Sequence, residues 1–182
     1  GGETMFKQFK IDLLNAKEAE RIVMEVLQTL SGDTYTYTNV SENKECWHKG
    51  DILCEDKIYY CRNYIDVKDD SCISRTGNIL AEDRVYYEDD GIFIDGFMKT
   101  AKYDYVAYVS KADNKIYMLD FQLWKKNYKR EGKFKEIPHP RQITYAYLMS
   151  LNRAKELGIV VAEIDYAAND GCYYPTSINK AA

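Results

Sequence analysis

The stretch that decides the fold reads Gly50-Asp51-Ile52 and then Tyr64-Ile65-Asp66-Val67-Lys68, with 14 residues between Asp51 and Asp66. Two β-forming segments, 52–54 and 58–67, flank the turn-like residues 55–57, which predicts an antiparallel hairpin. Side chains two apart on a strand share a face. Asp66 and Lys68 should therefore point one way, and Ile65 and Val67 into the core.

The hairpin predicts a pair of carboxylates. If the chain reverses near residues 58 and 59, Asp51 lies opposite Asp66, and a bulge must absorb the earlier position of the turn-like residues. Close carboxylates repel one another unless a cation lies between them, and Mg²⁺ or Mn²⁺ prefers such oxygen ligands. The Val67 carbonyl is a further candidate ligand. Lys68 would then position or deprotonate an attacking water.

The rest of the chain predicts an α/β sandwich around a mixed sheet. Apolar spacing predicts a helix over 15–30 and a second over 141–157, which Gly158 ends. Short strands are expected at 35–38, 76–81, 92–94 and 159–164, with an acidic loop at 82–90. A second hairpin should join 103–109 to 115–121.

The pattern of Asp51 followed by Asp66-Val67-Lys68 resembles the PD-(D/E)XK phosphodiesterase superfamily, and more narrowly its small phage or mobile-element nucleases. The resemblance implies a restriction-endonuclease-like fold, an α-β-β-β-α-β core with an inserted β-hairpin. It implies that Asp51, Asp66 and Lys68 are catalytic and that Asp51, Asp66, Val67 and Glu20 hold the metal. Gln142 matches a helical substrate-binding glutamine, although Ala146 stands where the family has Tyr. Gly50 replaces the usual proline.

The charge is unevenly distributed over 182 residues of net charge −4. The segment 123–135 carries +5, and residues 82–95 carry −5. The basic residues are candidates for phosphate contacts: Lys125, Lys126, Lys129 and Arg130. Trp124, Tyr128 and Phe134 could stack on unpaired bases, although an amphipathic helix with its aromatics packed inward would show the same pattern. Glu82 is a further candidate acid near the site.

Length and composition indicate one domain over 5–182, after residues 1–4, which are set aside as a cloning remnant. We expect a cytoplasmic protein, since no apolar run reaches the length of a membrane span and the five cysteines form no C-x-x-C pair. The expected function is Mg²⁺-dependent hydrolysis of nucleic acid, with DNA favoured and a homodimer suited to cutting two strands. The alternatives are an inactive nucleic-acid-binding or partner-binding protein of the same fold, and a tyrosine-rich scaffold.

Overall fold

The computed structural model describes residues 2–181, and its elements alternate irregularly between helix and strand. The helices are α1 (Gly2–Ser31), a 3₁₀ turn (Lys44–Cys46), α2 (Cys72–Thr76), α3 (Phe97–Thr100), α4 (Phe121–Glu131) and α5 (Leu151–Glu156). The first strands are β1 (Tyr35–Asn39), β2 (Ile52–Asp56), β3 (Arg62–Asp69), β4 (Asn78–Tyr87), β5 (Ile92–Asp95) and β6 (Tyr105–Ser110). The others are β7 (Lys115–Asp120), β8 (Lys133–His139), β9 (Gln142–Ser150), β10 (Val160–Asn169) and β11 (Cys172–Lys180). The fold is thus mixed α/β.

The larger sheet, sheet A, has seven strands in the order β1-β2-β3-β6-β7-β10-β11. Both predicted hairpins are present in it, as β2–β3 and β6–β7. Neighbouring strands are antiparallel except β3 and β6, which run parallel. A parallel pair needs a crossover connection, and here α2, β4, β5 and α3 supply it. Sheet A therefore places β3, with Asp66 and Lys68, next to a central buried strand.

The smaller sheet, sheet B, has the order β5-β4-β9-β8 and corrects the helix expected over 141–157. Residues 142–150 form β9, which pairs with both β4 and β8, and only 151–156 are helical before Gly158. Apolar residues occupy both faces of β9, so spacing did not separate strand from helix. The prolines 138 and 140 do not start a helix. They lie on the edge strand β8 and in its turn to β9, where a missing N–H is tolerated.

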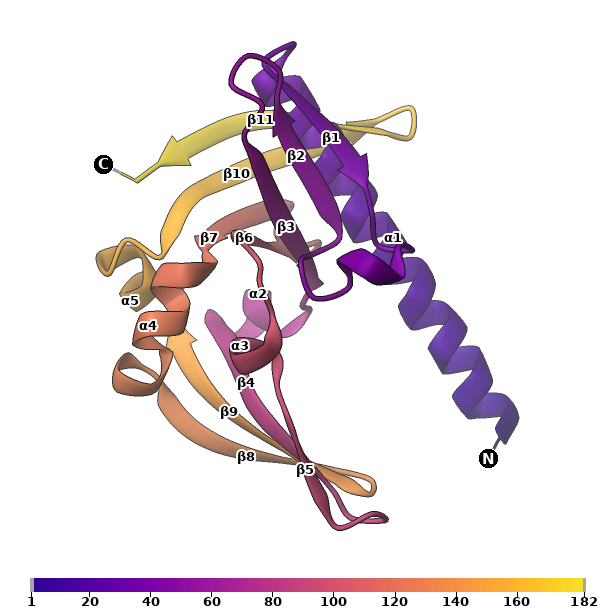
Figure 1. Cartoon of the computed structure of the whole chain (residues 1–182). Helices are drawn as coiled ribbons and strands as arrows, with labels where there is room; N and C mark the ends of the chain where they lie inside the picture. The colour runs from indigo at the N-terminus through magenta and orange to yellow at the C-terminus, as the bar shows by residue number, and fades with distance from the viewer. Residues whose placement is uncertain (1, 182) are drawn as a thin grey trace.

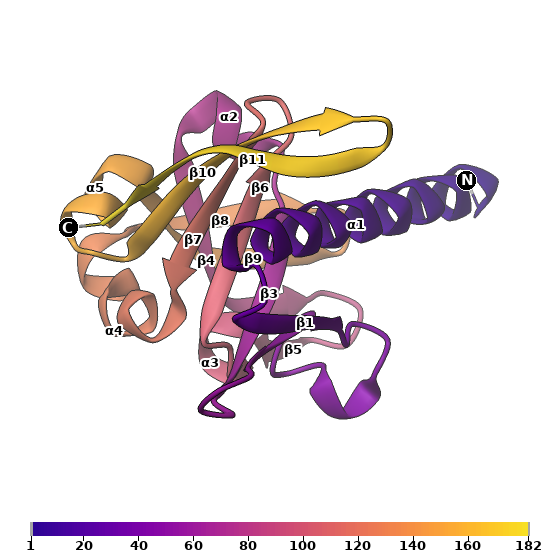
Figure 2. The same cartoon turned by 90° about the horizontal axis from the view of Figure 1, so that it is seen from above.

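Two further expectations are corrected at their boundaries. The acidic stretch 82–90 is not a loop, because β4 continues to Tyr87 and only the turn to β5 is left outside the strands. The first helix begins at Gly2 rather than near Asn15, so residues 2–4 belong to it, while Gly1 lies outside the described residues. The N-terminal part of α1 projects beyond the sheets, whereas its C-terminal part packs against sheet A (Figures 1 and 2).

Sheet A separates two hydrophobic cores. One core joins the inner face of α1, including Ile22 and Val26, to sheet residues such as Ile52, Ile65 and Ile116. The other, built around Trp124, Phe121 and Met98, fills the space between the opposite face of sheet A, the helices α3 to α5 and sheet B (Figure 1). Within the described residues, no helix is long and apolar enough to cross a bilayer.

Candidate functional site

The β2–β3 hairpin brings Asp51 and Asp66 together. Ile52 pairs with Ile65 and Glu55 with Arg62 without interruption. The Asp51 N–H donates to the Ile65 carbonyl at 2.9 Å, one residue away from the partner that this register would give, so the regular pairing ends at Ile52. The Asp51 side chain still lies close enough to Asp66 for the two carboxyl groups to interact. The predicted reversal near 58 and 59 is confirmed, but the bulge predicted to absorb the position of the turn is absent from the paired residues 52–55 and 62–65. The Asp56 carboxylate accepts the N–H groups of Ile58 and Tyr59, so the chain turns there instead.

Asp66 and Lys68 share the face of β3 that turns away from α1, as alternation predicts. Ile65 is buried in the α1 core, whereas the Lys68 ammonium lies 2.9 Å from Asp66 Oδ2. The same ammonium lies 4.3 Å from the Phe97 ring centroid and 5.8 Å from that of Tyr103. Aromatic faces attract cations, so one carboxylate and two rings together hold Lys68 in place.

Burial and repulsion perturb the acids of this pair. Asp51 Oδ2 accepts the Val67 N–H at 2.8 Å, yet burial and then the negative charge of Asp66 raise the pKa of Asp51 to about 7. Burial, followed by the charges of Asp66 and Asp51, also raises the pKa of the Tyr103 hydroxyl. Asp66 Oδ2 is fully buried and accepts no hydrogen bond of ordinary geometry besides its ion pair with Lys68. The side chains of Tyr103 and Asp51 also interact with Asp66, and Lys68 is the one cation paired with these two acids among residues 2–181.

Gly50 is required by the close approach of the two strands. Its φ of +137° lies in the region that disfavours L side chains, and a Cβ there would come within 2.8 Å of the Ile65 carbonyl oxygen. Glycine thus lets the chain enter β2 with Asp51 directed at Asp66.

The other two predicted acids lie near the pair in different ways. Glu20 is buried on α1, and its Oε2 accepts hydrogen bonds from Asn39 at 2.9 Å and Ser41 at 3.0 Å. Its charge contributes to the raised pKa of Asp51, after burial and Asp66. Glu82 lines a cavity of about 730 Å³ together with Lys68 and Phe97. The structure therefore gives Glu82 access to the same open space as Lys68.

The Asp51–Asp66 pair meets the basic requirement of a Mg²⁺ or Mn²⁺ site. Mg²⁺ in proteins is held by one or two carboxylates and completes its shell with waters and substrate phosphates. Two converging carboxylates, one with a buried oxygen that lacks a hydrogen bond, fit that requirement. Residues 2–181 contain no group of three or more His, Cys, Asp or Glu side chains that could hold a metal by themselves. An ion at this pair would therefore need further ligands, such as water, a backbone carbonyl or a bound molecule.

The basic segment is split between helix and strand, and its aromatics are mostly buried. Trp124 and Tyr128 lie in the core, which contradicts their proposed stacking on bases, whereas Phe134 is 46% exposed on β8. Trp124 and Tyr128 are four residues apart on α4, so both lie on the face of the helix that packs against the core. The interpretation of the segment as an amphipathic helix is therefore correct for these two residues.

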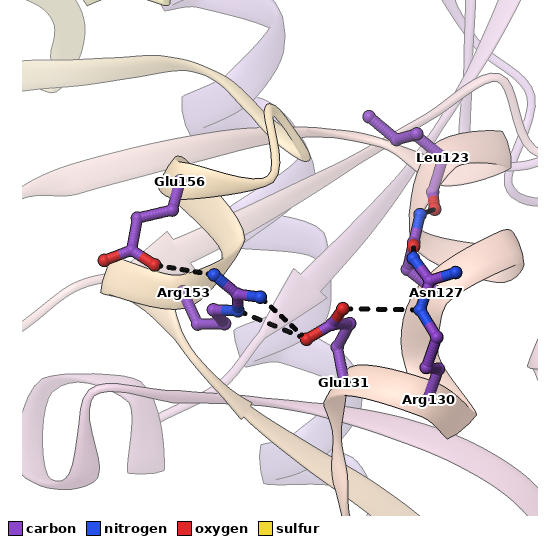
Figure 3. Close-up of polar contacts among 6 residues, drawn as sticks. All are labelled: Leu123, Asn127, Arg130, Glu131, Arg153 and Glu156. Atoms are coloured by element: carbon purple, nitrogen blue, oxygen red, sulfur yellow. Dashed lines mark hydrogen bonds and ion pairs between the residues drawn. The ribbon is translucent and has the colours of Figure 1, made fainter.

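Two of the four predicted phosphate-binding residues have partners within the protein. Lys129 pairs with the buried Asp83 at 3.2 Å. Arg130 donates hydrogen bonds to Asn127 and Glu131, and Glu131 also accepts hydrogen bonds from Arg153 of α5 (Figure 3). Lys125 lies over the Phe121 ring, and Lys126 is exposed without a hydrogen bond or ion pair to the described residues. No hydrogen bond or ion pair joins these four to Asp51, Asp66 or Lys68 within 2–181.

Gln142 lies at the start of β9, opposite His139 and Tyr87, and not in a first helical turn. Its helical placement is therefore wrong, and a role in substrate binding stays a prediction. The sequence reasoning missed Tyr103 and Phe97, which contact Lys68. No local signal identified them, because they precede β6 and open α3 and reach Lys68 only through the packing of the two sheets.

Comparisons with protein-family models, curated protein sequences and solved structures gave no match. The site is therefore interpreted from its own geometry.

Proposed function

We propose that this protein is a metal-dependent nuclease, a hydrolase of phosphodiester bonds in nucleic acid, with DNA the favoured substrate. One observation carries the proposal: the β2–β3 hairpin brings the carboxyl groups of Asp51 and Asp66 together, and Lys68 lies 2.9 Å from Asp66 on the same face. Burying two acids that share one cation costs free energy, which a solvated hairpin would avoid. The restriction-endonuclease-like core belongs to the same proposal.

Asp51 and Asp66 would hold Mg²⁺ or Mn²⁺, with the Val67 carbonyl and Glu20 as further candidates. A bound ion of this kind lowers the pKa of its water and stabilises charge on a phosphoryl oxygen. Glu20 accepts its hydrogen bonds from Asn39 and Ser41 through Oε2, and these bonds orient its carboxylate. Direct ligation by Glu20 would therefore use Oε1.

Lys68 would act on the attacking water and on the phosphate. Its ammonium is held at a defined point by Asp66, Phe97 and Tyr103, and its side chain is 29% exposed. From there Nζ can donate a hydrogen bond to a phosphate oxygen or orient a water for in-line attack. A cation held in advance offsets the developing negative charge without reorganisation.

The decisive experiment incubates the purified protein with linear and circular DNA in Mg²⁺ or Mn²⁺. The Asp66→Ala, Lys68→Ala double variant should lose cleavage. The matched control is Glu55→Ala, Arg62→Ala, which removes an exposed 3.1 Å ion pair from the same hairpin and should cut like the wild type. Cleavage that persists in the site variant would overturn the proposal.

A second candidate, a binding protein that does not cut, is favoured by one observation. The cavity beside Lys68 is also lined by Asp12, Asp69, Asp70 and Glu82, which disfavour a polyanion in the absence of a cation. Calorimetry with Mn²⁺ discriminates between the two. Heat that is unchanged by Asp51→Ala, Asp66→Ala, together with no cleavage by the wild type, would favour the binding protein.

A further inference from the structure

Sheet B carries a continuous row of aromatic rings that the proposed cleavage site does not use. On one face of the sheet, consecutive ring centroids lie 4.9 Å apart for Tyr86–Phe93, 5.9 Å for Phe93–Tyr145, 6.1 Å for Tyr145–Phe134 and 5.5 Å for Phe134–Tyr147. Register explains the alignment. Tyr86 pairs directly with Phe93, and Phe134 with Tyr147, and paired residues point to the same face.

The row is buried at one end and open at the other. Tyr147 packs edge-on against Tyr128 of α4, which joins the row to the core. Beyond α4 the rings face solvent, and Phe93 and Phe134 are 55% and 46% exposed. Sheet B extends away from sheet A in this region (Figure 1). Core packing therefore accounts for Tyr147 but not for the two exposed phenylalanines.

A cation without a counter-ion lies within the open part of the row. The Arg84 guanidinium lies 4.9 Å from the ring centroids of both Phe93 and Tyr145, and it forms no ion pair within residues 2–181. Asp95, directly opposite Arg84 in the register, is paired instead with Lys99 at 3.4 Å. Glu136, across from Tyr145, is the other acid on this face. Arg84 thus remains available to an anion.

We propose that this aromatic face binds single-stranded DNA, with unpaired bases stacked on Phe93 and Phe134 and a phosphate bound to Arg84. Flat rings with an interleaved cation match the alternating chemistry of bases and phosphates. On β5 the exposed aliphatic residues Ile92 and Ile94 alternate to the opposite face, so this face presents rings and a cation without exposed aliphatic side chains from that strand. The proposal does not depend on the cleavage site, because it is tested without metal.

The test measures fluorescence anisotropy of labelled (dT)₂₀ in EDTA. Removing a stacking ring weakens such complexes by roughly 5- to 100-fold, so we expect a loss of this size for Phe93→Ala and Phe134→Ala and a larger loss for the double variant. Arg84→Ala should weaken binding and flatten its salt dependence. Circular dichroism and thermal unfolding establish that each variant is folded.

Matched control variants distinguish base stacking from nonspecific binding through exposed side chains. Ile94→Ala removes a side chain of similar exposure, 50%, from the opposite face of the same strand, and Tyr59→Ala removes a 76% exposed aromatic from the β2–β3 turn. Both should bind like the wild type. Phe93→Tyr should retain binding, whereas Phe93→Leu, which keeps apolar area without a ring, should not.

Three outcomes would overturn the proposal: no binding of (dT)₂₀ by the wild type, equal binding by the Phe93→Ala, Phe134→Ala variant, or equal affinity for an abasic 20-mer. If the wild type bound a peptide but not (dT)₂₀, and the Phe93→Ala, Phe134→Ala variant lost that peptide binding, the face would be assigned to a protein partner. If one of these outcomes rejects the surface, cleavage of double-stranded DNA by the wild type in Mg²⁺ would still support the proposed nuclease, so the two proposals can fail separately.

Discussion

Asp51 is the residue whose environment departs most from that of an ordinary surface acid. Its raised pKa follows from burial and from Asp66, and the ion pair of Asp66 with Lys68 compensates only part of the local charge. Such perturbation is typical of sites that bind a cation or act on a proton. Without a bound cation, the same perturbation should lower the free energy of unfolding when Asp51 is ionised, and this effect can be measured.

The pH dependence of folding should reveal Asp51. The folded pKa of Asp51, about 7, lies above the unfolded value of 3.8. Below about pH 4 the residue is protonated in both states and does not change the free energy of unfolding. As the pH rises from about 4 to about 7, the unfolded state loses the proton first, so the free energy of unfolding decreases. Without metal, Asp51→Asn should therefore match the wild type at pH 4 and exceed its stability at pH 8 by a few kcal/mol, at roughly 1.4 kcal/mol per pKa unit. Urea denaturation measures this, and an unchanged difference between pH 4 and pH 8 would contradict it.

Gly50 offers a second test of the hairpin entry. Gly50→Ala combines positive φ with a Cβ only 2.8 Å from the Ile65 carbonyl oxygen, so it should destabilise the fold by roughly 1–3 kcal/mol or more and reduce cleavage. Gly91→Ala is the matched control. Gly91 also has positive φ, +63°, but nothing lies within 4 Å of its added Cβ. Equal losses of stability would show that the close approach to Ile65 does not matter.

Among the elements, α4 shows that residues of a basic segment can stabilise the fold through contacts with a neighbouring sheet. The Tyr128 hydroxyl donates to the buried Asp83 of β4 at 2.5 Å, and Lys129 and Lys99 complete the surroundings of that carboxylate. Donors from α3 and α4 thus converge on one acid of sheet B. Burial raises the pKa of Asp83, but the hydrogen bonds from Tyr128 and Lys129 and the charges of Lys129 and Lys99 together hold that pKa below its ordinary value.

Tyr128→Phe tests this junction without disturbing the site. Hydrogen bonds to charged groups contribute roughly 1.5–3 kcal/mol, and since two lysines remain we expect a loss toward the lower end of that range. Tyr59→Phe, at an exposed position, should change nothing. Chemical denaturation gives the stability, and cleavage should persist in both variants. A Tyr128→Phe protein as stable as the wild type would show that the lysines alone satisfy Asp83.

The site is coupled to the stability of the whole molecule, because the hairpin that carries Asp51 and Asp66 packs through Ile52 and Ile65 into the hydrophobic core beneath α1. A cation that binds the folded pair but not the unfolded chain must raise the unfolding temperature. The predicted site can therefore be tested without any substrate.

Mn²⁺ should stabilise the wild type at pH 7.5 by about 2.7 kcal/mol at a concentration 100 times its dissociation constant. Asp51→Asn, Asp66→Asn should abolish that gain, while Glu55→Ala, Arg62→Ala should retain it. Calorimetric unfolding with and without Mn²⁺ makes the comparison. The same shift in all three proteins would place the bound ion elsewhere.

Local features could be predicted because neighbours in the sequence enforce them. The reversal at 58–59 and the alternation along 65–68 depend on a short turn and on the two-residue strand period, and with them the proximity of Asp51 and Asp66 follows. The helix over 15–30 was likewise readable, since its apolar stripe repeats every three or four residues.

Long-range pairing decided the rest. Residues 142–150 became a strand because β4 and β8 supply hydrogen bonds on both sides, a context that apolar spacing cannot encode. Trp124 and Tyr128 were buried, and Lys129 was paired with Asp83, because α4 packs against sheet B. The carboxylate pair is thus a property of a local hairpin, whereas the environment of Lys68 and the aromatic face of sheet B exist because distant segments fold together.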